Sequence, residues 1–208
     1  MTKNRLFPAK GYVNFIHDAL AKCIKAGYVP SPSWESVEER ILNPESNHWQ
    51  WHQTRGLLGV IKIDNEDCLF LTNLYPLRLN SDPDYIEKMF DDGKLVMASC
   101  PIPDSDRTEI INASGRRDNN GNLICSITPL SRGKEEHSEL EHPLCEPAFG
   151  TQDRAIRYID ALKGKGSKLD YRFIDLVGYA RPVGFGNDEG CVFGHAYNDL
   201  GRFSGALK

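Results

Sequence analysis

Two apolar runs joined by a short polar turn constrain the fold of this chain more than any other feature. The runs cover 57–63 and 68–74, and Asp64-Asn65-Glu66-Asp67 between them is typical turn sequence. We therefore expect a β-hairpin at this point. Because the first run is apolar at consecutive rather than alternate positions, its strand is expected to be buried on both faces and central in its sheet.

The remaining elements follow from apolar spacing and from capping residues. Helical spacing predicts helices over 12–26, from 34 to about 42, after Asp82-Pro83 and after Thr151, the last with a buried stripe at Ile156, Ile159 and Leu162. Further elements are expected as follows: single strands over 94–99, 171–180 and 191–197, a second hairpin over 108–114 and 122–128, and a turn over 183–190. This order predicts an α+β fold, with a mainly antiparallel sheet built from hairpins and about four helices packed largely on one side.

Length and composition indicate an ordinary globular protein. The chain has 208 residues, 40% hydrophobic content and a net charge of −4, which fits a single domain over 1–208. Within it we expect a helical N-terminal segment over 1–46 and a long acidic surface loop over 129–150. The mildly acidic balance argues against bulk binding of nucleic acid, which needs many basic side chains on one face. No apolar leader or membrane span is present, so we expect a cytoplasmic protein.

The six cysteines do not form a recognisable site. No Cys-x-x-Cys pair occurs, so the sequence supports neither a zinc ribbon nor a dithiol redox motif. Cys23, Cys68, Cys125 and Cys191 lie in apolar helix or strand patterns, where a free cysteine behaves as a small hydrophobic residue. We interpret them as reduced core residues.

The densest chemistry lies just before the hairpin, at 47–56. His48 and His52 are four residues apart and would face the same way on a helical turn, where they can bind one metal ion such as zinc or another divalent cation. This spacing lacks the glutamate of the zinc-protease motif His-Glu-x-x-His. Further ligands would have to come from the acidic loop, which offers His137, His142 and Cys145.

Two other interpretations of the same segment stay open. In the first, Trp49 and Trp51 pack on the hairpin, with one histidine as a hydrogen-bonded spacer and the other in solvent. In the second, a histidine acts as a metal-free acid or base while Arg55 holds a carboxylate or phosphate substrate. No complete catalytic motif is visible, so the sequence leaves open whether the chain is an enzyme.

Basic side chains gather between residues 151 and 184, which contain seven Lys and Arg and four Asp. The leading hypothesis is an intracellular binding or accessory protein that engages a protein or nucleic acid through the His48–Arg55 segment and a basic face. The contact residues would be two tryptophans and six basic side chains: Trp49, Trp51, Arg116, Arg117, Arg154, Arg157, Lys165 and Lys168.

The second hypothesis is a metal-dependent hydrolase or nuclease. His48 and His52 would ligate the metal, with Arg55 or Arg117 holding the anionic part of the substrate. The two hypotheses differ in their requirements. The enzyme needs a third ligand in a concave site, whereas the binding protein needs only exposed aromatic and basic side chains on one surface.

Overall fold

The computed structural model describes residues 5–8, 16–42, 52–97, 99–130, 140–161, 169–172, 176–185, 190–194 and 202–207. Helices and strands both occur throughout this part of the chain, which confirms the α+β class. In order, the elements are β1 Arg5–Pro8, α1 Ile16–Lys25, β2 Tyr28–Pro30, α2 Ser33–Leu42, β3 His52–Ile63, β4 Glu66–Thr72, α3 Arg78–Ser81, α4 Pro83–Asp91, β5 Cys100–Pro101, α5 Asp104–Asn112, β6 Cys125–Pro129, α6 Cys145–Phe149, α7 Gln152–Ala161, β7 Leu169–Arg172, β8 Tyr179–Phe185, β9 Gly190–Gly194 and β10 Arg202–Leu207.

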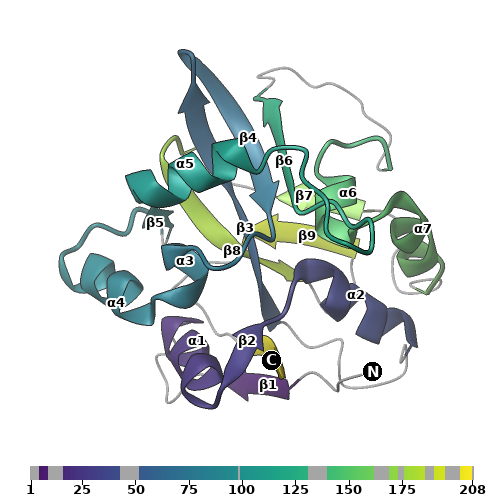
Figure 1. Ribbon diagram of the computed structural model, residues 1–208, viewed down its shortest axis with the longest axis horizontal. Helices are drawn as coiled ribbons and strands as arrows, with labels where there is room; N and C mark the ends of the chain where they lie inside the picture. The colour runs from purple at the N-terminus through teal and green to yellow at the C-terminus, as the bar shows by residue number, and fades with distance from the viewer. Residues whose placement is uncertain are drawn as a thin grey trace.

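Strand β3 is the centre of a branched, mainly antiparallel sheet. The longest path through the sheet runs β1-β10-β3-β8-β9-β7, while β4 pairs with both β3 and β6. The start of β3 contacts β10, its second half pairs with β4, and β8 runs along its other edge (Figure 1). Parallel pairing is confined to the β3–β10 and β7–β9 contacts among the described strands. The predicted central position of the 57–63 strand is therefore confirmed.

The turn of the first hairpin is shorter than the polar stretch suggested. Asp64 and Asn65 have φ of 48° and 68°, and Ile63 pairs with Glu66. Positive φ at two central residues is the type I′ geometry that matches the twist of a hairpin, and Asp and Asn tolerate it better than other side chains. Glu66 and Asp67 consequently belong to β4, and the predicted hairpin is confirmed.

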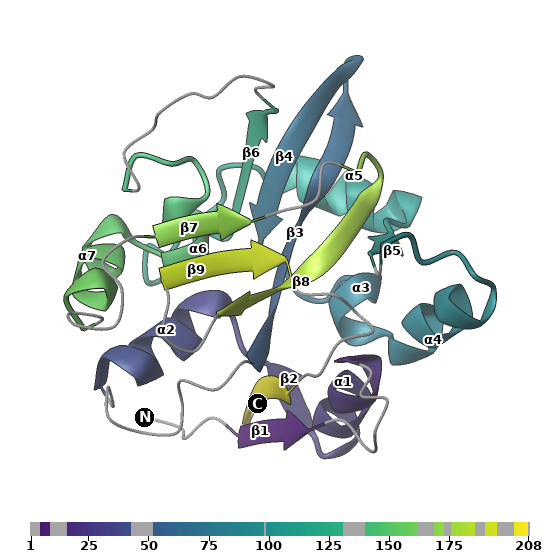
Figure 2. The same ribbon diagram turned by 180° about the vertical axis from the view of Figure 1, so that it is seen from behind.

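Both faces of the hairpin are covered by helices, which leaves its alternate residues in two separate cores. Leu57 and Ile61 enter a first core with residues of α1, α3, α4 and α5. Leu58 and Val60 enter a second core with residues of α2, α6 and α7. Figures 1 and 2 show these two groups of helices on opposite sides of β3 and β4. Of the predicted helices, α1 and α4 thus lie on one side and α2 and α7 on the other, because β3 is apolar on both faces.

The predicted second hairpin is wrong in its first strand. Residues 104–112 form α5, with Asp104 and Asp106 in its first turn and Ile110 buried in the first core. Acidic residues in a first turn favour a helix because they face the positive end of its dipole. The predicted 122–128 strand is β6, and its partner is β4 rather than a neighbour in sequence.

Three further expectations are corrected. The 94–99 segment is a tight turn closed by reciprocal backbone hydrogen bonds between Val96 and Ser99, not a strand. The 129–150 loop ends in α6, whose Cys145, Ala148 and Phe149 are buried in the second core. The glycine-rich 183–190 segment begins as strand, since 183–185 close β8. Residues 131–139 and 186–189 lie outside the described residues.

The helix starts follow the predicted capping. Asp82 accepts a hydrogen bond from the Tyr85 backbone N–H (3.1 Å) at the start of α4, and Thr151 does the same for Arg154 (3.2 Å) at α7. The predicted stripe of α7 is shifted, since Ala155 and Tyr158 are its buried residues and Ile156 is exposed. No helix in the described part of the chain is both long and apolar enough to cross a membrane.

Candidate functional site

The structure describes only the second half of the segment that the sequence singled out. Residues 43–51, with His48, Trp49 and Trp51, lie outside the described residues. His52 is the first residue of β3, so the helical spacing that paired it with His48 does not apply at His52. The metal role of this pair stays a prediction. Arg55, three residues into the strand, is well described and has an unusual environment.

Arg55 is held at three points. Its backbone N–H donates to the Ser31 carbonyl oxygen (2.8 Å), which joins β3 to the chain just before α2. Its side-chain Nε donates to the Asn73 carbonyl oxygen (2.9 Å) just after β4. The guanidinium also lies over the ring of Tyr75, with Cζ 5.9 Å from the ring centroid. A long side chain fixed in this way loses little further freedom when it binds a ligand.

Two buried asparagines form the support beneath Arg55. The Asn73 side chain accepts from the Ser33 backbone N–H (2.7 Å) and donates to the Pro147 carbonyl oxygen (2.9 Å). The Asn80 side chain donates to the carbonyl oxygens of Arg55 (2.9 Å) and Leu74 (2.8 Å). Sequence reasoning missed both residues. For Asn73 the available signal was its position at the end of an apolar strand, where an asparagine side chain can form hydrogen bonds with neighbouring backbone.

Arg55 is a partly buried cation that no described carboxylate contacts. Burial lowers its pKa, and the more distant charges of Glu35 and Asp118, with Tyr75, act in the opposite direction. A guanidinium nevertheless stays protonated at neutral pH. Its two terminal nitrogens have no hydrogen-bond partner among the described residues. Together they can donate two parallel hydrogen bonds to a carboxylate or a phosphate.

Three of the four described arginines of the predicted basic face pair with glutamates. Glu38 of α2 bridges two arginines of α7, with 3.1 Å to Arg154 Nε and 2.8 Å to Arg157 Nη2. Arg117 Nη1 lies 2.6 Å from Glu146, which raises the pKa of Arg117. Arg116 is exposed, whereas Lys165 and Lys168 lie outside the described residues. The described arginines of this face therefore offer less net charge than the sequence suggested.

Of the predicted metal ligands, the structure describes the side chains of His142 and Cys145. No group of three His, Cys, Asp or Glu side chains able to hold a metal ion occurs in the part of the chain that the structure describes. His142 uses its Nδ1 to accept the Leu144 backbone N–H (3.1 Å), and Cys145 is buried in the second core. His137 lies outside the described residues.

Buried cysteines offer no described nucleophile. Cys23, Cys68, Cys100, Cys125 and Cys145 are free thiols inside the protein. Burial raises the pKa of Cys23 and of Cys100 to about 12, so both stay protonated and unreactive at neutral pH. The predicted core role of Cys23, Cys68 and Cys125 is confirmed, and the side chain of Cys191 lies outside the described part.

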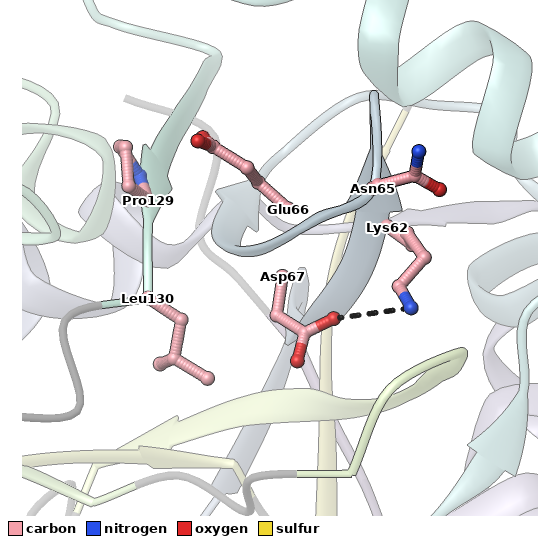
Figure 3. A pocket seen from close by; sticks show the side chains of 6 residues that line it. All are labelled: Lys62, Asn65, Glu66, Asp67, Pro129 and Leu130. Carbon is pink, nitrogen blue, oxygen red and sulfur yellow. Dashed lines mark ion pairs between the residues drawn. The ribbon is translucent and has the colours of Figure 1, made fainter.

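A hollow of about 500 Å³ lies at the tip of the β3–β4 hairpin (Figure 3). It is lined by Lys62, Asn65, Glu66, Asp67, Pro129 and Leu130. Lys62 Nζ lies 3.9 Å from Asp67 Oδ1 there. Small-molecule sites are usually concave and mostly apolar with a few convergent polar groups, and this charged, open hollow lacks that character.

Arg55 and its asparagine support are thus the best-defined candidate site of the described chain. Comparisons with protein-family models, with curated proteins and with solved structures find no match.

Proposed function

We propose that this chain is a binding protein that engages an acidic side chain of a protein partner through Arg55. The observation that carries the proposal is a fixed, partly buried guanidinium whose terminal nitrogens lack a carboxylate in the described structure. Burying such a cation costs free energy that a partner's carboxylate would offset. Arginine is also one of the residue types that contribute most at protein interfaces.

Charge favours a protein over a nucleic acid at this site. Glu35 and Asp118 are near enough to affect the pKa of Arg55, so a phosphate backbone would meet two carboxylates beside a single cation. Nucleic-acid binding draws most of its affinity from several phosphate contacts. Three arginines of the predicted basic face already pair with Glu38 and Glu146. A single carboxylate on a protein surface fits this balance better.

The test is affinity capture from cells that produce the chain, with the wild type and three variants compared by quantitative mass spectrometry. Arg55→Gln should reduce the captured partner at least about tenfold, the loss expected when a charge-assisted hydrogen bond is removed. Arg107→Gln is the matched control, because Arg107 is an exposed arginine of α5 outside the site and outside the predicted contact residues. It should capture the partner as the wild type does.

Glu35→Gln is a variant with the opposite expectation. Removing one of the two carboxylates near Arg55 reduces the repulsion that the partner's carboxylate meets, so capture should increase and withstand higher salt. If Arg55→Gln captures the same partners in the same amounts, with a wild-type melting temperature, the proposal is wrong. Should Arg55→Gln melt early, the Glu35→Gln result decides, and unchanged or weaker capture by that variant counts against the site.

A metal-dependent hydrolase stays a second prediction from the sequence. No contact among the described residues favours it over the binding function. Elemental analysis of the untagged chain, purified without chelator, tests it directly. Near-stoichiometric zinc that disappears in His48→Ala/His52→Ala would revive the hydrolase and weaken the present proposal.

A further inference from the structure

The last turn of α4 and the segment that leads from it to β5 carry exposed hydrophobic side chains, which we call the apolar tip. It consists of Phe90, Val96 and Met97, three of the six large hydrophobic side chains that the described structure exposes. Met97 is the most open of them, with 69% of its surface accessible. Single exposed hydrophobic residues are common on protein surfaces, whereas several on one short segment indicate a site of interaction.

The tip is held firmly rather than hanging from a loose loop. Val96 and Ser99 exchange two backbone hydrogen bonds of 3.1 and 2.9 Å, which makes Met97 the apex of a tight turn. Arg181 of β8 donates to the Ser99 hydroxyl (2.7 Å) and fixes the base of that turn to the sheet. On the helical side, Phe90 packs against the His17 ring of α1, with centroids 6.3 Å apart.

Met97 adopts a backbone conformation that favours glycine. Its φ is +48°, in the left-handed region where a side chain collides with the following carbonyl group. The chain uses glycine at six other described positions with positive φ, including Gly93 four residues earlier. A large side chain at the exposed apex therefore costs stability without contributing to the core. Strain of this kind often marks a functional position.

The charges around the tip are negative on balance, because Glu87, Asp91 and Asp92 outnumber Lys88 and Lys94. Glu87 lies one helical turn before Phe90, at a spacing of three residues, and Asp91 lies four residues after Glu87. Both are exposed, and the described structure pairs neither with a basic side chain. Asp92 is neutralised by Lys94 (2.9 Å). An apolar apex beside unpaired carboxylates matches a partner surface with an apolar pocket and basic residues at its rim.

We infer that the Phe90–Met97 tip is a docking surface for a protein segment in which apolar side chains alternate with lysines or arginines. This surface is separate from Arg55, whose ligand would be acidic, so either site can fail without the other. Methionine suits such contacts because its flexible, polarisable side chain adapts to different apolar partners.

The test uses two synthetic amphipathic peptides, one of leucine and lysine and one of leucine and glutamate, titrated into the ¹⁵N-labelled full chain. The leucine–lysine peptide should shift the amide signals of residues 87–97, and the leucine–glutamate peptide should not. Met97→Gly should weaken binding of the first peptide about tenfold, as expected for a contact at the centre of an interface. Because glycine relieves the left-handed φ, its melting temperature should be no lower than that of the wild type.

Met97→Leu and Ile156→Ala serve as matched variants. Leucine keeps an apolar side chain at the apex, so Met97→Leu should retain binding. Ile156 is an exposed hydrophobic residue of α7 outside the tip, so Ile156→Ala should also retain binding. Glu87→Gln/Asp91→Asn should weaken the leucine–lysine peptide and reduce the salt dependence of its binding. Equal binding of both peptides, shifts spread over all surface carboxylates, or wild-type affinity in Met97→Gly would each overturn the inference.

Discussion

Replacement of Asn73 by alanine is the sharpest test of how the candidate site is held. Asn73 is fully buried, and its side chain makes two hydrogen bonds to distant segments. It accepts from the Ser33 N–H at the start of α2 and donates to the Pro147 carbonyl oxygen in α6. Alanine removes both bonds, so the Ser33 N–H and the Pro147 carbonyl oxygen lose Asn73 as a partner. Both groups lie where helices of the second core meet the sheet.

The expected loss follows from these two bonds. Leaving a buried polar group without its partner costs about 1–3 kcal/mol, so the pair predicts a loss of about 2–6 kcal/mol in the free energy of unfolding. Typical domains have only about 5–15 kcal/mol in total. Asn73→Ala is therefore expected to remain folded at low temperature but to unfold at a much lower urea concentration. Asn112→Ala, an exposed site at the end of α5, should change stability by less than about 0.5 kcal/mol.

Urea unfolding followed by circular dichroism measures both variants, with the slope of the transition checked for two-state behaviour. Asn73→Asp separates hydrogen bonding from shape, because it keeps the acceptor for Ser33 but turns an oxygen toward the Pro147 carbonyl. It should be at least as unstable as alanine at neutral pH and should recover partly in acid, where the carboxyl is protonated. A loss below about 1 kcal/mol for Asn73→Ala would refute the role assigned to this side chain.

Three shorter predictions concern the packing around the two cores. Glu38→Gln removes the carboxylate shared by two arginines of α7 and should cost about 1–2 kcal/mol in urea unfolding, less in high salt, because the pair is only partly buried. Burial lowers the pKa of His17, so the unfolded chain takes up a proton at a higher pH than the folded chain does. Stability should therefore fall from about pH 7 to pH 5 in the wild type and fall less in His17→Gln, as thermal melting at each pH would reveal. Gly59→Ala should destabilise the protein by about 3 kcal/mol in the same urea assay, since a Cβ there would overlap the Tyr179 carbonyl oxygen of the adjacent strand.

Local sequence was sufficient where one physical signal dominated. The hairpin at 57–74 and the central position of β3 both depend on residues adjacent in sequence, and both were predicted, although the turn is two residues shorter than predicted. So were the caps at Asp82 and Thr151, where the side chain and its backbone partner are three residues apart. Residues close together in the sequence are therefore sufficient to predict these elements.

The errors occurred where two local signals competed. Residues 108–114 contain paired isoleucines that favour a strand, but the preceding Asp104 and Asp106 favour a helix start, and the helix formed. Asp106 is more than a local signal, because its carboxylate accepts the backbone N–H groups of Arg78 (3.0 Å) and Leu79 (3.1 Å) at the start of α3. Local preference left helix and strand balanced at 104–114, and these contacts over 27 and 28 positions favour the helix α5.

The candidate site was the least predictable part because charge is balanced in space rather than along the chain. Glu38 lies 116 residues from Arg154, and Glu146 lies 29 from Arg117, so a count of local charge assigned the arginines to a basic face that their distant partners neutralise. At Arg55, which the sequence singled out to hold an anion, the distant contacts fix the side chain instead of neutralising it. Its sequence neighbours gave no sign that it would be fixed on Asn73 and Tyr75 without a contacting carboxylate among the described residues. An arginine becomes a recognition site when folding orients it and leaves its charge unpaired, and both conditions depend on tertiary contacts.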